Sequence, residues 1–478
     1  MLYDLVVSIK FRQHSNEFQT KLKNNIRTIA NEGKMFIAAD KTSNYYKVPK
    51  DKHEELLKKQ INKDYKKTDQ NIVKNITKKD KEIAANLEID DRVYATSHRQ
   101  AFITLKDHKP NFQNVQSCRL LNPTKSEIGR VSKKIVEKIN LIVRDKSKVN
   151  QWKNTSAVVD WFKNITDKKR LKFVQFDICD FYSSISEDLI NQTLDYAEQF
   201  VAITNQDRKI IIQASQALLF DKQTPWIKKG NSAFNVGMGS FDGAEICELV
   251  GLFLLSKLKD LKLDLGLYRD GVCALTPRQA DKMKKEMCRI FGEYNLRITI
   301  DVNHKIVNFL DVTFNLDSGV YKPYMKPNDT LSYVNKNSNH PPSILQNIPA
   351  GVNQRLSSIS ENEGVFNEAI PPYQNALKNS GYDTVLKYDE NAKNRRGSKT
   401  RSRNITWFNP PFSANVFTSI GAKFLRIIDN CFPQPTQNLQ PEHNKGLLRM
   451  YAKLWAGYLQ TQCKNRQAGR CSSPTPWM

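Results

Sequence analysis

The chain has 478 residues and a mass of 55.1 kDa, which at about 100–200 residues per domain predicts two to four domains. Hydrophobic residues make up 39% of it, with only 19 Gly and 19 Pro, which excludes collagen-like and low-complexity chains. Lysine and arginine number 74 against 49 acidic residues, a net charge of +25. A surplus of this size favours a polyanionic partner, with nucleic acid first and an anionic membrane surface second.

The membrane alternative is weaker, because the longest apolar run, residues 246–255, is interrupted by Glu248. It is also far shorter than the ~20 residues that span a bilayer. The N-terminus lacks the basic-then-apolar order of a signal peptide. The eight cysteines are therefore expected to be reduced thiols, and none is arranged as CxxC, which argues against a zinc module. We expect an intracellular protein.

Residues 1–95 are predicted to form a basic, mainly helical N-terminal extension. Phe18, Leu22, Ile26 and Ile29 recur at helical spacing, and many lysines follow them along the chain. For any single lysine a solvated helix face is the simpler interpretation, and only their sum argues for contact with phosphate.

A strand is predicted from Phe102, followed by a basic loop, KDHKPNFQNVQ, and a return strand in CRLLNP. A helix is expected over about residues 125–143. The run LKFVQFDI, residues 171–178, has the pattern of a buried strand and ends in Asp177. Ser184 and Glu187 then form a capping-box signature for the next helix. Asp177 is therefore expected at the carboxyl end of a central strand.

A glycine-spaced loop, residues 237–243, leads into an apolar helix. The sequence GLYRDGVCAL then predicts a hairpin, since Asp270-Gly271 joins two short apolar runs. Further strands are expected through about residue 324 and helices beyond Pro341. The segment 391–403 has six basic residues and no acid and is predicted to be a surface loop.

Asp177 and Asp270 are the acids that suggest chemistry in this basic chain. Two carboxylates brought together can hold Mg²⁺, which prefers hard oxygen ligands and leaves room for substrate phosphates. For either acid alone, capping or beginning a turn is the simpler interpretation.

Four motifs in order give a resemblance to a known family. FDICDFYSSI, GMGSFDGAE, GLYRDG and NHKIVNFLDVTF resemble the palm motifs of reverse transcriptases. ITLKDHKP, CRLLNP and YKPYMKPNDTLSYVNKNSNHPPSI resemble the flanking segments of Penelope-like retroelement polymerases. The resemblance extends over about residues 95–430. It implies an α+β right-hand polymerase of fingers, palm and thumb, with an antiparallel palm sheet.

The resemblance also implies a domain order. Fingers would occupy residues 96–170 and the palm 171–330, with a fingers insertion at about 190–230. The thumb and post-thumb segment would cover 331–432, and a polar tail 433–478. An RNA template, a DNA primer and deoxynucleoside triphosphates would be the partners and two magnesium ions, or manganese, the cofactors. A retroelement enzyme needs access to the nucleus, so nucleus is expected before cytoplasm.

Individual roles follow by position. Asp177 and Asp270 would be the metal ligands, with the backbone carbonyl of Ile178. Tyr182 would lie where a ribose 2′-hydroxyl would be, favouring deoxynucleotides; the plainer interpretation is a core tyrosine. The remaining expected substrate contacts are a phosphate clamp, a template-side turn and a proton donor: Arg119 with Lys106 or Lys109, Gly239 with Ser240, and Lys305. Residues 309–311 would mark the primer-grip hairpin, or plain core.

Two departures from the family pattern stand out. The motif around Asp270 ordinarily carries a second aspartate, and here Gly271 stands in that position. Its loss removes negative charge beside the metals and predicts weak or absent synthesis. The GIY-YIG endonuclease motifs that follow many such polymerases are not found.

Three functions are compatible with these features. The first is an RNA-directed DNA polymerase. The second is a catalytically inactive nucleic-acid-binding protein with a polymerase fold, which Gly271 favours. The third, a basic structural or chromatin-associated protein, explains the charge but not the ordered motifs.

Overall fold

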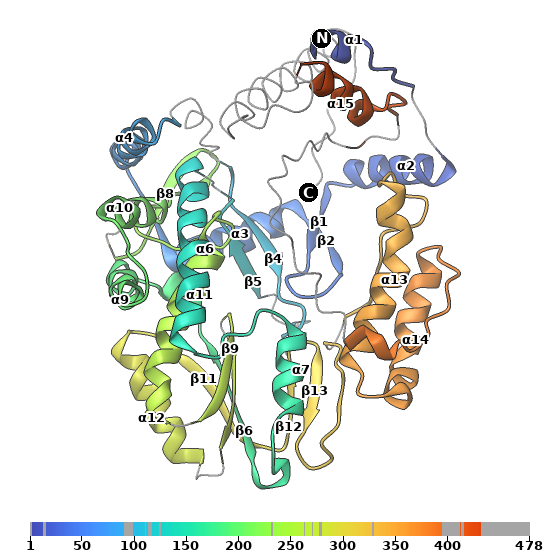
Figure 1. Cartoon of the computed structure of the whole chain (residues 1–478). Coiled ribbons are helices and arrows are strands. Elements are labelled where there is room, and N and C mark those ends of the chain that lie inside the picture. Colours follow the sequence, from blue (N-terminus) through green and yellow to red (C-terminus); the bar gives the residue numbers. More distant parts are fainter. Residues whose placement is uncertain are drawn as a thin grey trace. The chain divides into compact units, whose positions relative to one another are not determined.

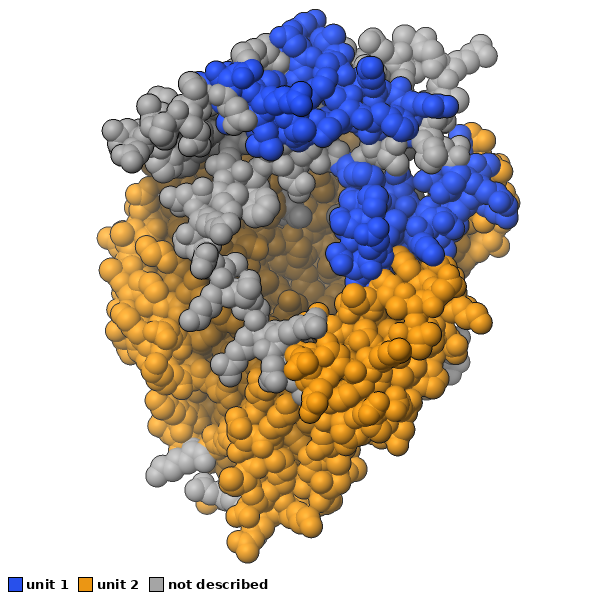
Figure 2. Space-filling view, turned by 45° about the vertical axis from the view of Figure 1, so that its right-hand side comes forward, with its two compact units in different colours: residues 1–23, 334–348, 395–478 blue, residues 24–333, 349–394 orange. Residues whose placement is uncertain are grey.

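The computed structural model describes residues 2–12, 16–89, 99–109, 111–112, 117–123, 126–230, 233–261, 263–269, 271–276, 280–326, 329–393, 412 and 415–431. Asp270, most of the basic loop 391–403 and the tail 433–478 lie outside these residues. Contacts divide the chain into two compact units, coloured separately in Figure 2. The larger unit contains residues 24–333 and 349–394, and the smaller one 1–23, 334–348 and 395–478.

A four-stranded antiparallel sheet forms the centre of the larger unit, in the order β11-β6-β10-β9 (Figure 1). The strands are β6 (Lys172–Ile178), β9 (Asp264–Tyr268), β10 (Gly271–Thr276) and β11 (Ile298–His304). Side chains alternate along β6, so Val174, Phe176 and Ile178 enter one hydrophobic core while Phe173 enters another. The prediction that the 171–178 run is a central buried strand is confirmed.

Helices cover both faces of this sheet. On one face lie α6 (Glu127–Ser147), α11 (Gly243–Leu258) and α12 (Ala280–Glu293), where Phe291 stacks edge-on against Phe176. The other face packs against α7 (Thr155–Lys163) and a second sheet, β12-β13-β14. These strands are β12 (Ile306–Phe309), β13 (Val312–Asn315) and β14 (Tyr321–Pro323). In Figure 1, α12 and α7 lie on opposite sides of the central strands.

Three small sheet regions precede and interrupt the central sheet. β4 (Phe102–Leu105) pairs with β5 (Cys118–Leu121), and β1 (Lys34–Ala38) pairs with β2 (Tyr45–Pro49). β3 (Tyr65–Lys67) pairs with β8 (Thr224–Lys228), which also pairs with β7 (Leu219–Asp221). The segment expected to be a mainly helical extension thus also contributes strands, and β3 pairs with the expected insertion. Its helices in this unit are α3 (Lys50–Asp64) and α4 (Gln70–Asn86), and α2 (Glu17–Asn31) precedes them.

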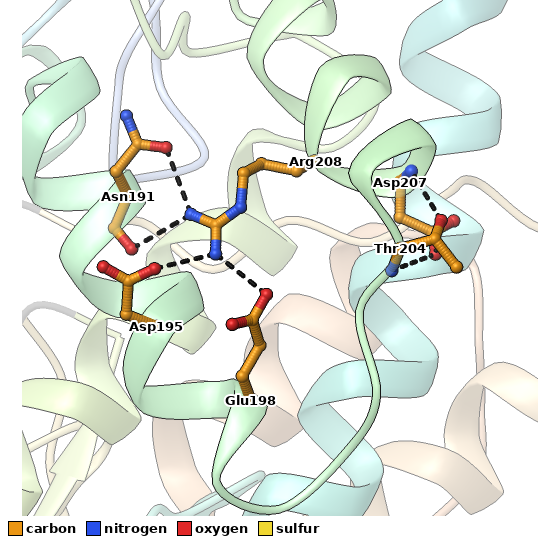
Figure 3. Close-up of polar contacts among 6 residues, drawn as sticks. All are labelled: Asn191, Asp195, Glu198, Thr204, Asp207 and Arg208. Carbon is orange, nitrogen blue, oxygen red and sulfur yellow. Dashed lines mark hydrogen bonds and ion pairs between the residues drawn. The ribbon is translucent and has the colours of Figure 1, made fainter.

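The insertion begins with a helical hairpin of α9 (Glu187–Glu198) and α10 (Asn205–Ala214) (Figure 3), and β7 and β8 follow it. Arg208 on α10 binds the carboxylates of Asp195 and Glu198 on α9, at 2.7 and 2.9 Å. Thr204 and Asp207 form a capping box that begins α10. The cap predicted for α9 at Ser184 is wrong. Ser184 ends the short helix α8 (Phe181–Ser184), and the hydroxyl of Ser186 accepts the amide hydrogen of Leu189 instead.

Two further helices of the region beyond Pro341 are α13 (Pro342–Ile359) and α14 (Glu363–Asn379), as the sequence predicts. In the smaller unit, α1 (Leu2–Val7) packs against α15 (Ile420–Cys431) through Leu5, Ile420 and Phe424. None of the described helices is long and apolar enough to cross a membrane. The predicted α+β class with antiparallel sheets is confirmed.

Candidate active site

Asp177 lies at the carboxyl end of β6, between two neighbouring strands. Its register partners are Gly271 on β10 and Thr299 on β11. Because Ile178 points into the core and strand side chains alternate, the Asp177 side chain stands on the opposite face, where it is exposed. Ile178 is only 1% exposed, so its side chain is core and only its backbone carbonyl could have the expected role of metal ligand.

Asp177 lines a cavity of about 620 Å³. Among the described residues that line it, lysine and arginine outnumber aspartate eight to three. The cations are Lys41, Lys63, Lys106, Lys109, Arg119, Lys228, Lys229 and Arg297, and the acids are Asp64, Asp177 and Asp180. A strongly positive concave surface with a carboxylate at one strand end suits a substrate that carries several phosphates.

One group of cations comes from the β4–β5 hairpin, which brings the predicted phosphate-binding residues together. Arg119 lies on β5, and Lys106 and Lys109 lie in the turn that follows β4. Burial lowers the pKa of Lys106 below its usual range, and the adjacent Arg119 cation adds to the effect. Asp180 and Asp40 offset only part of this repulsion between like charges, and a bound phosphate would relieve it further.

Two acids that the sequence analysis did not single out hold this hairpin. The carboxylate of Asp40, from the loop after β1, lies 3.2 Å from Arg119 Nε. Asp107 is fully buried in the KDHK turn and accepts hydrogen bonds from three side chains of the β1–β2 region. An acid flanked by lysines in a basic loop is the one sequence signal that could have indicated Asp107.

Tyr182 lies on α8, directly after the strand that carries Asp177, and it lines the same cavity. The ring is half-buried against the main core, so both of its predicted roles, core tyrosine and substrate neighbour, agree with its position. The ammonium of Lys228 donates to the carbonyl of Ser183, the next residue. This contact attaches β8 to α8 and places a half-buried cation beside Tyr182. Partial burial lowers the pKa of Lys228.

Gly239 and Ser240 form a tight turn at the start of α11, next to Gly237 and Met238, which line the cavity. Gly239 has φ +109°, and a Cβ built on it would lie 2.7 Å from the carbonyl oxygen of Asn122. The Asn122 amide in turn donates to the Met238 carbonyl at 3.2 Å. Glycine is therefore required for the backbone of this turn to meet the strand that carries Arg119. Ser240 closes the turn through a hydroxyl bond to the Gly237 carbonyl, at 3.0 Å.

Lys305 lies elsewhere. Its ammonium donates to the carbonyl of Leu171, just before β6 begins, and forms an ion pair with Asp317 at 3.6 Å. Asp177 is at the other end of the same strand, and Lys305 does not line the cavity. The expected primer-grip residues are mixed: Phe309 is core, while Asp311 accepts hydrogen bonds from Thr155 and Arg355.

The donor set for a metal is incomplete in the described part of the chain. No group of three His, Cys, Asp or Glu is close enough to hold an ion among these residues. Asp177 and Asp180 nevertheless both line the cavity and offer carboxylate oxygens, the ligand type that Mg²⁺ prefers. The other expected ligand, Asp270, lies outside the described residues, and its chain neighbour Gly271 is the register partner of Asp177.

Comparison with known proteins finds similar folds among solved structures. No family model and no curated protein matches the chain. A telomerase from Candida albicans bound to a telomeric RNA fragment is similar over 77% of this chain and 68% of that one, at 10% identity and a TM-score of 0.48. Apo telomerase from Candida tropicalis covers 79% and 74%, at 10% and 0.47. The RNA-dependent RNA polymerase of a human picobirnavirus covers 76% and 82%, at 9% and 0.41. At 9–10% identity, the similarity concerns the fold alone.

Proposed function

We propose that the chain is an RNA-directed DNA polymerase of a Penelope-like retroelement, which extends a DNA primer on an RNA template. The observation that carries the proposal is the cavity, where Asp177 ends the central strand opposite a dense group of cations. The order of the sequence motifs supports the same function. Four of the residues that these motifs predict to contact substrate also line this one cavity: Arg119, Lys106, Lys109 and Tyr182.

In the proposed reaction the primer 3′-hydroxyl oxygen attacks the α-phosphorus of a deoxynucleoside triphosphate. A new P–O bond forms, the bond to pyrophosphate breaks, and the hydroxyl proton leaves to solvent or a nearby base. Arg119, Lys106 and Lys109 would bind the triphosphate, and a guanidinium can hold a phosphate with two hydrogen bonds. Their fixed positive charge would stabilise the negative charge that builds on the leaving pyrophosphate.

The remaining residues would orient the substrates. Tyr182 would lie against the sugar and disfavour a 2′-hydroxyl, and the Gly239–Ser240 turn would face the base pair being formed. Magnesium, when bound, would neutralise phosphate charge and activate the attacking hydroxyl. Asp177, the Ile178 carbonyl and Asp270 would hold it. A retroelement polymerase of this kind would act in the nucleus.

A second candidate, a nucleic-acid-binding protein without turnover, rests on Gly271. This glycine is the β10 partner of Asp177, and no carboxylate can extend from it toward the metal position. The basic cavity would then bind nucleic acid or nucleotide without catalysis.

Primer extension on an RNA template separates the two candidates. Asp177→Asn should abolish extension while binding of a labelled RNA–DNA duplex, followed by fluorescence polarisation, stays within about twofold of wild type. Asp301→Asn is the matched control, since Asp301 is an exposed acid on the adjacent strand of the same sheet. Duplex binding without extension by the wild-type chain, with either metal, would favour the second candidate. Equal loss in both variants would refute a special role for Asp177.

A further inference from the structure

The loop between β1 and β2 is attached firmly to the phosphate-binding hairpin. Ala39 forms a parallel bridge with Leu105 at the end of β4, and the Asp40 amide donates to the Leu105 carbonyl at 2.7 Å. Ile37 and Val48 belong to the same hydrophobic cluster as Leu105 and Cys118. The β1–β2 and β4–β5 hairpins therefore share one hydrophobic cluster and one isolated backbone bridge, although more than 50 residues of chain separate them.

Asp40 in this loop holds Arg119 by one edge. The Asp40 side chain is only 7% exposed, and its Oδ1 lies 3.2 Å from Arg119 Nε. The other oxygen, Oδ2, is buried without a hydrogen-bond partner among the described residues. A guanidinium has five donor hydrogens, so a contact at Nε leaves its two terminal nitrogens for a phosphate. Arg119 lines the cavity and is 30% exposed, as a residue with that task must be.

The same loop and the start of β2 hold the lysine turn through Asp107. Thr42 Oγ1, Asn44 Nδ2 and Tyr46 OH donate to one carboxylate oxygen of Asp107, at 2.5, 3.0 and 3.0 Å. Burial alone raises the pKa of Asp107, but these hydrogen bonds outweigh it, so the pKa lies below its usual value. Asp107 therefore stays ionised and fixed. Lys106 precedes it and Lys109 follows it within one turn, closed by the Lys109 amide to the Lys106 carbonyl at 3.1 Å.

We infer that residues 40–46 are a positioning element for the triphosphate: Asp40 acts through Arg119, and Thr42, Asn44 and Tyr46 act through Asp107 on the two lysines. This inference rests on the proposed function, because it assigns the cations to the phosphates of a nucleotide. Residues 40–46 precede the part of the chain that resembles polymerase motifs. In this arrangement two buried acids, Asp40 and Asp107, increase the affinity of the cavity for a polyanion.

A purely electrostatic role and a positioning role of Asp40 predict opposite changes in nucleotide affinity when Asp40 is replaced. The direction of that change therefore tests the inference. If Asp40 only offsets positive charge, Asp40→Asn makes the cavity more positive and should tighten nucleotide binding. If Asp40 positions Arg119, the same substitution releases the guanidinium and weakens binding. We expect positioning to dominate, with about a tenfold loss of affinity, because an immobilised fork loses less freedom on binding than a mobile one.

The test measures binding of a fluorescent deoxynucleoside triphosphate, with competition by inorganic triphosphate, to the full chain. Asp40→Asn and Tyr46→Phe should each weaken binding, and Asp40→Glu, which keeps the charge, should recover part of the loss. Tyr45→Phe is the matched control, because Tyr45 is next to Tyr46 and 70% exposed. Where extension is measurable, KM for the nucleotide should rise while kcat stays within about twofold.

Tighter or unchanged binding by Asp40→Asn would overturn the inference, as would a wild-type chain that binds no triphosphate. A fall in kcat with unchanged KM would also overturn it. A circular-dichroism spectrum that matches wild type would show that a variant's loss of binding does not result from unfolding. Because the main readout is binding, absence of primer extension would count against the proposed function only.

Discussion

Replacing Gly239 with alanine tests the close approach between the glycine turn and the strand that carries Arg119. Gly239 combines φ +109° with a Cβ position only 2.7 Å from the Asn122 carbonyl oxygen. Ordinary contact begins at 3.4 Å, so the Asn122 backbone would have to move by about 0.7 Å. That movement also strains the hydrogen bond from the Asn122 amide to the Met238 carbonyl.

Alanine variants of two other glycines separate the contributions to the expected loss of unfolding free energy. Gly230 has φ +102° but nothing within 4 Å of its Cβ position, so Gly230→Ala should cost the backbone strain alone, about 1–3 kcal/mol. Gly292 lies in α12 with neither feature, and Gly292→Ala should stabilise the helix by up to about 1 kcal/mol. Gly239→Ala adds a damaged hydrogen bond of ~1 kcal/mol to the strain and should lower the unfolding free energy by about 2–4 kcal/mol.

Urea titration followed by tryptophan fluorescence compares the three variants, and nucleotide binding is measured on the same samples. Gly239→Ala should also weaken binding, because the displaced Asn122 lies three residues after Arg119. Equal stability of the Gly239 and Gly230 variants would refute the steric part of the reasoning. Wild-type stability in both would refute the requirement for glycine as well.

Three further predictions concern the same site. Gly271→Asp should raise primer extension by about tenfold or more, since its Cβ would lie 3.4 Å from the Phe309 ring and fits; Gly271→Asn, equal in size but uncharged, should give no gain, and equal gains would refute a charge effect. Burial raises the pKa of Asp242 to about 6, above its unfolded value of 3.8, so the folded chain retains that proton longer and its unfolding free energy falls as pH rises from about 4 to 6. Asp242→Asn should flatten this part of the pH–stability profile and stabilise the chain near neutral pH, measured by urea midpoints; an unchanged profile would contradict the assignment. Tyr182→Ala should increase the kcat/KM for ribonucleotides relative to deoxynucleotides, whereas Tyr182→Phe, which keeps the ring, should not; equal discrimination in both would make Tyr182 a core residue only.

Local patterns anticipated much of the fold. The 171–178 run becomes β6 because it is apolar enough to be buried on both faces, and its alternation leaves Asp177 exposed. Asp-Gly at 270–271 indicated the β9–β10 hairpin, whose strands pair antiparallel as expected. The predicted cap of α9 lies two residues before the observed one, because the sequence offers three serines within four positions and only the fold selects Ser186.

Local sequence was enough to predict the strand that ends in Asp177, the basic hairpin with Arg119 and the glycine-spaced loop before α11, because each depends on neighbours within a few residues. Which distant segments meet depends on packing across the larger unit. Asp40 reaches Arg119, and Tyr65 pairs with Lys228, through contacts between segments that no local periodicity encodes. Lys305 illustrates the converse, since the family resemblance implied a proton donor there but packing places it at the opposite end of β6 from Asp177.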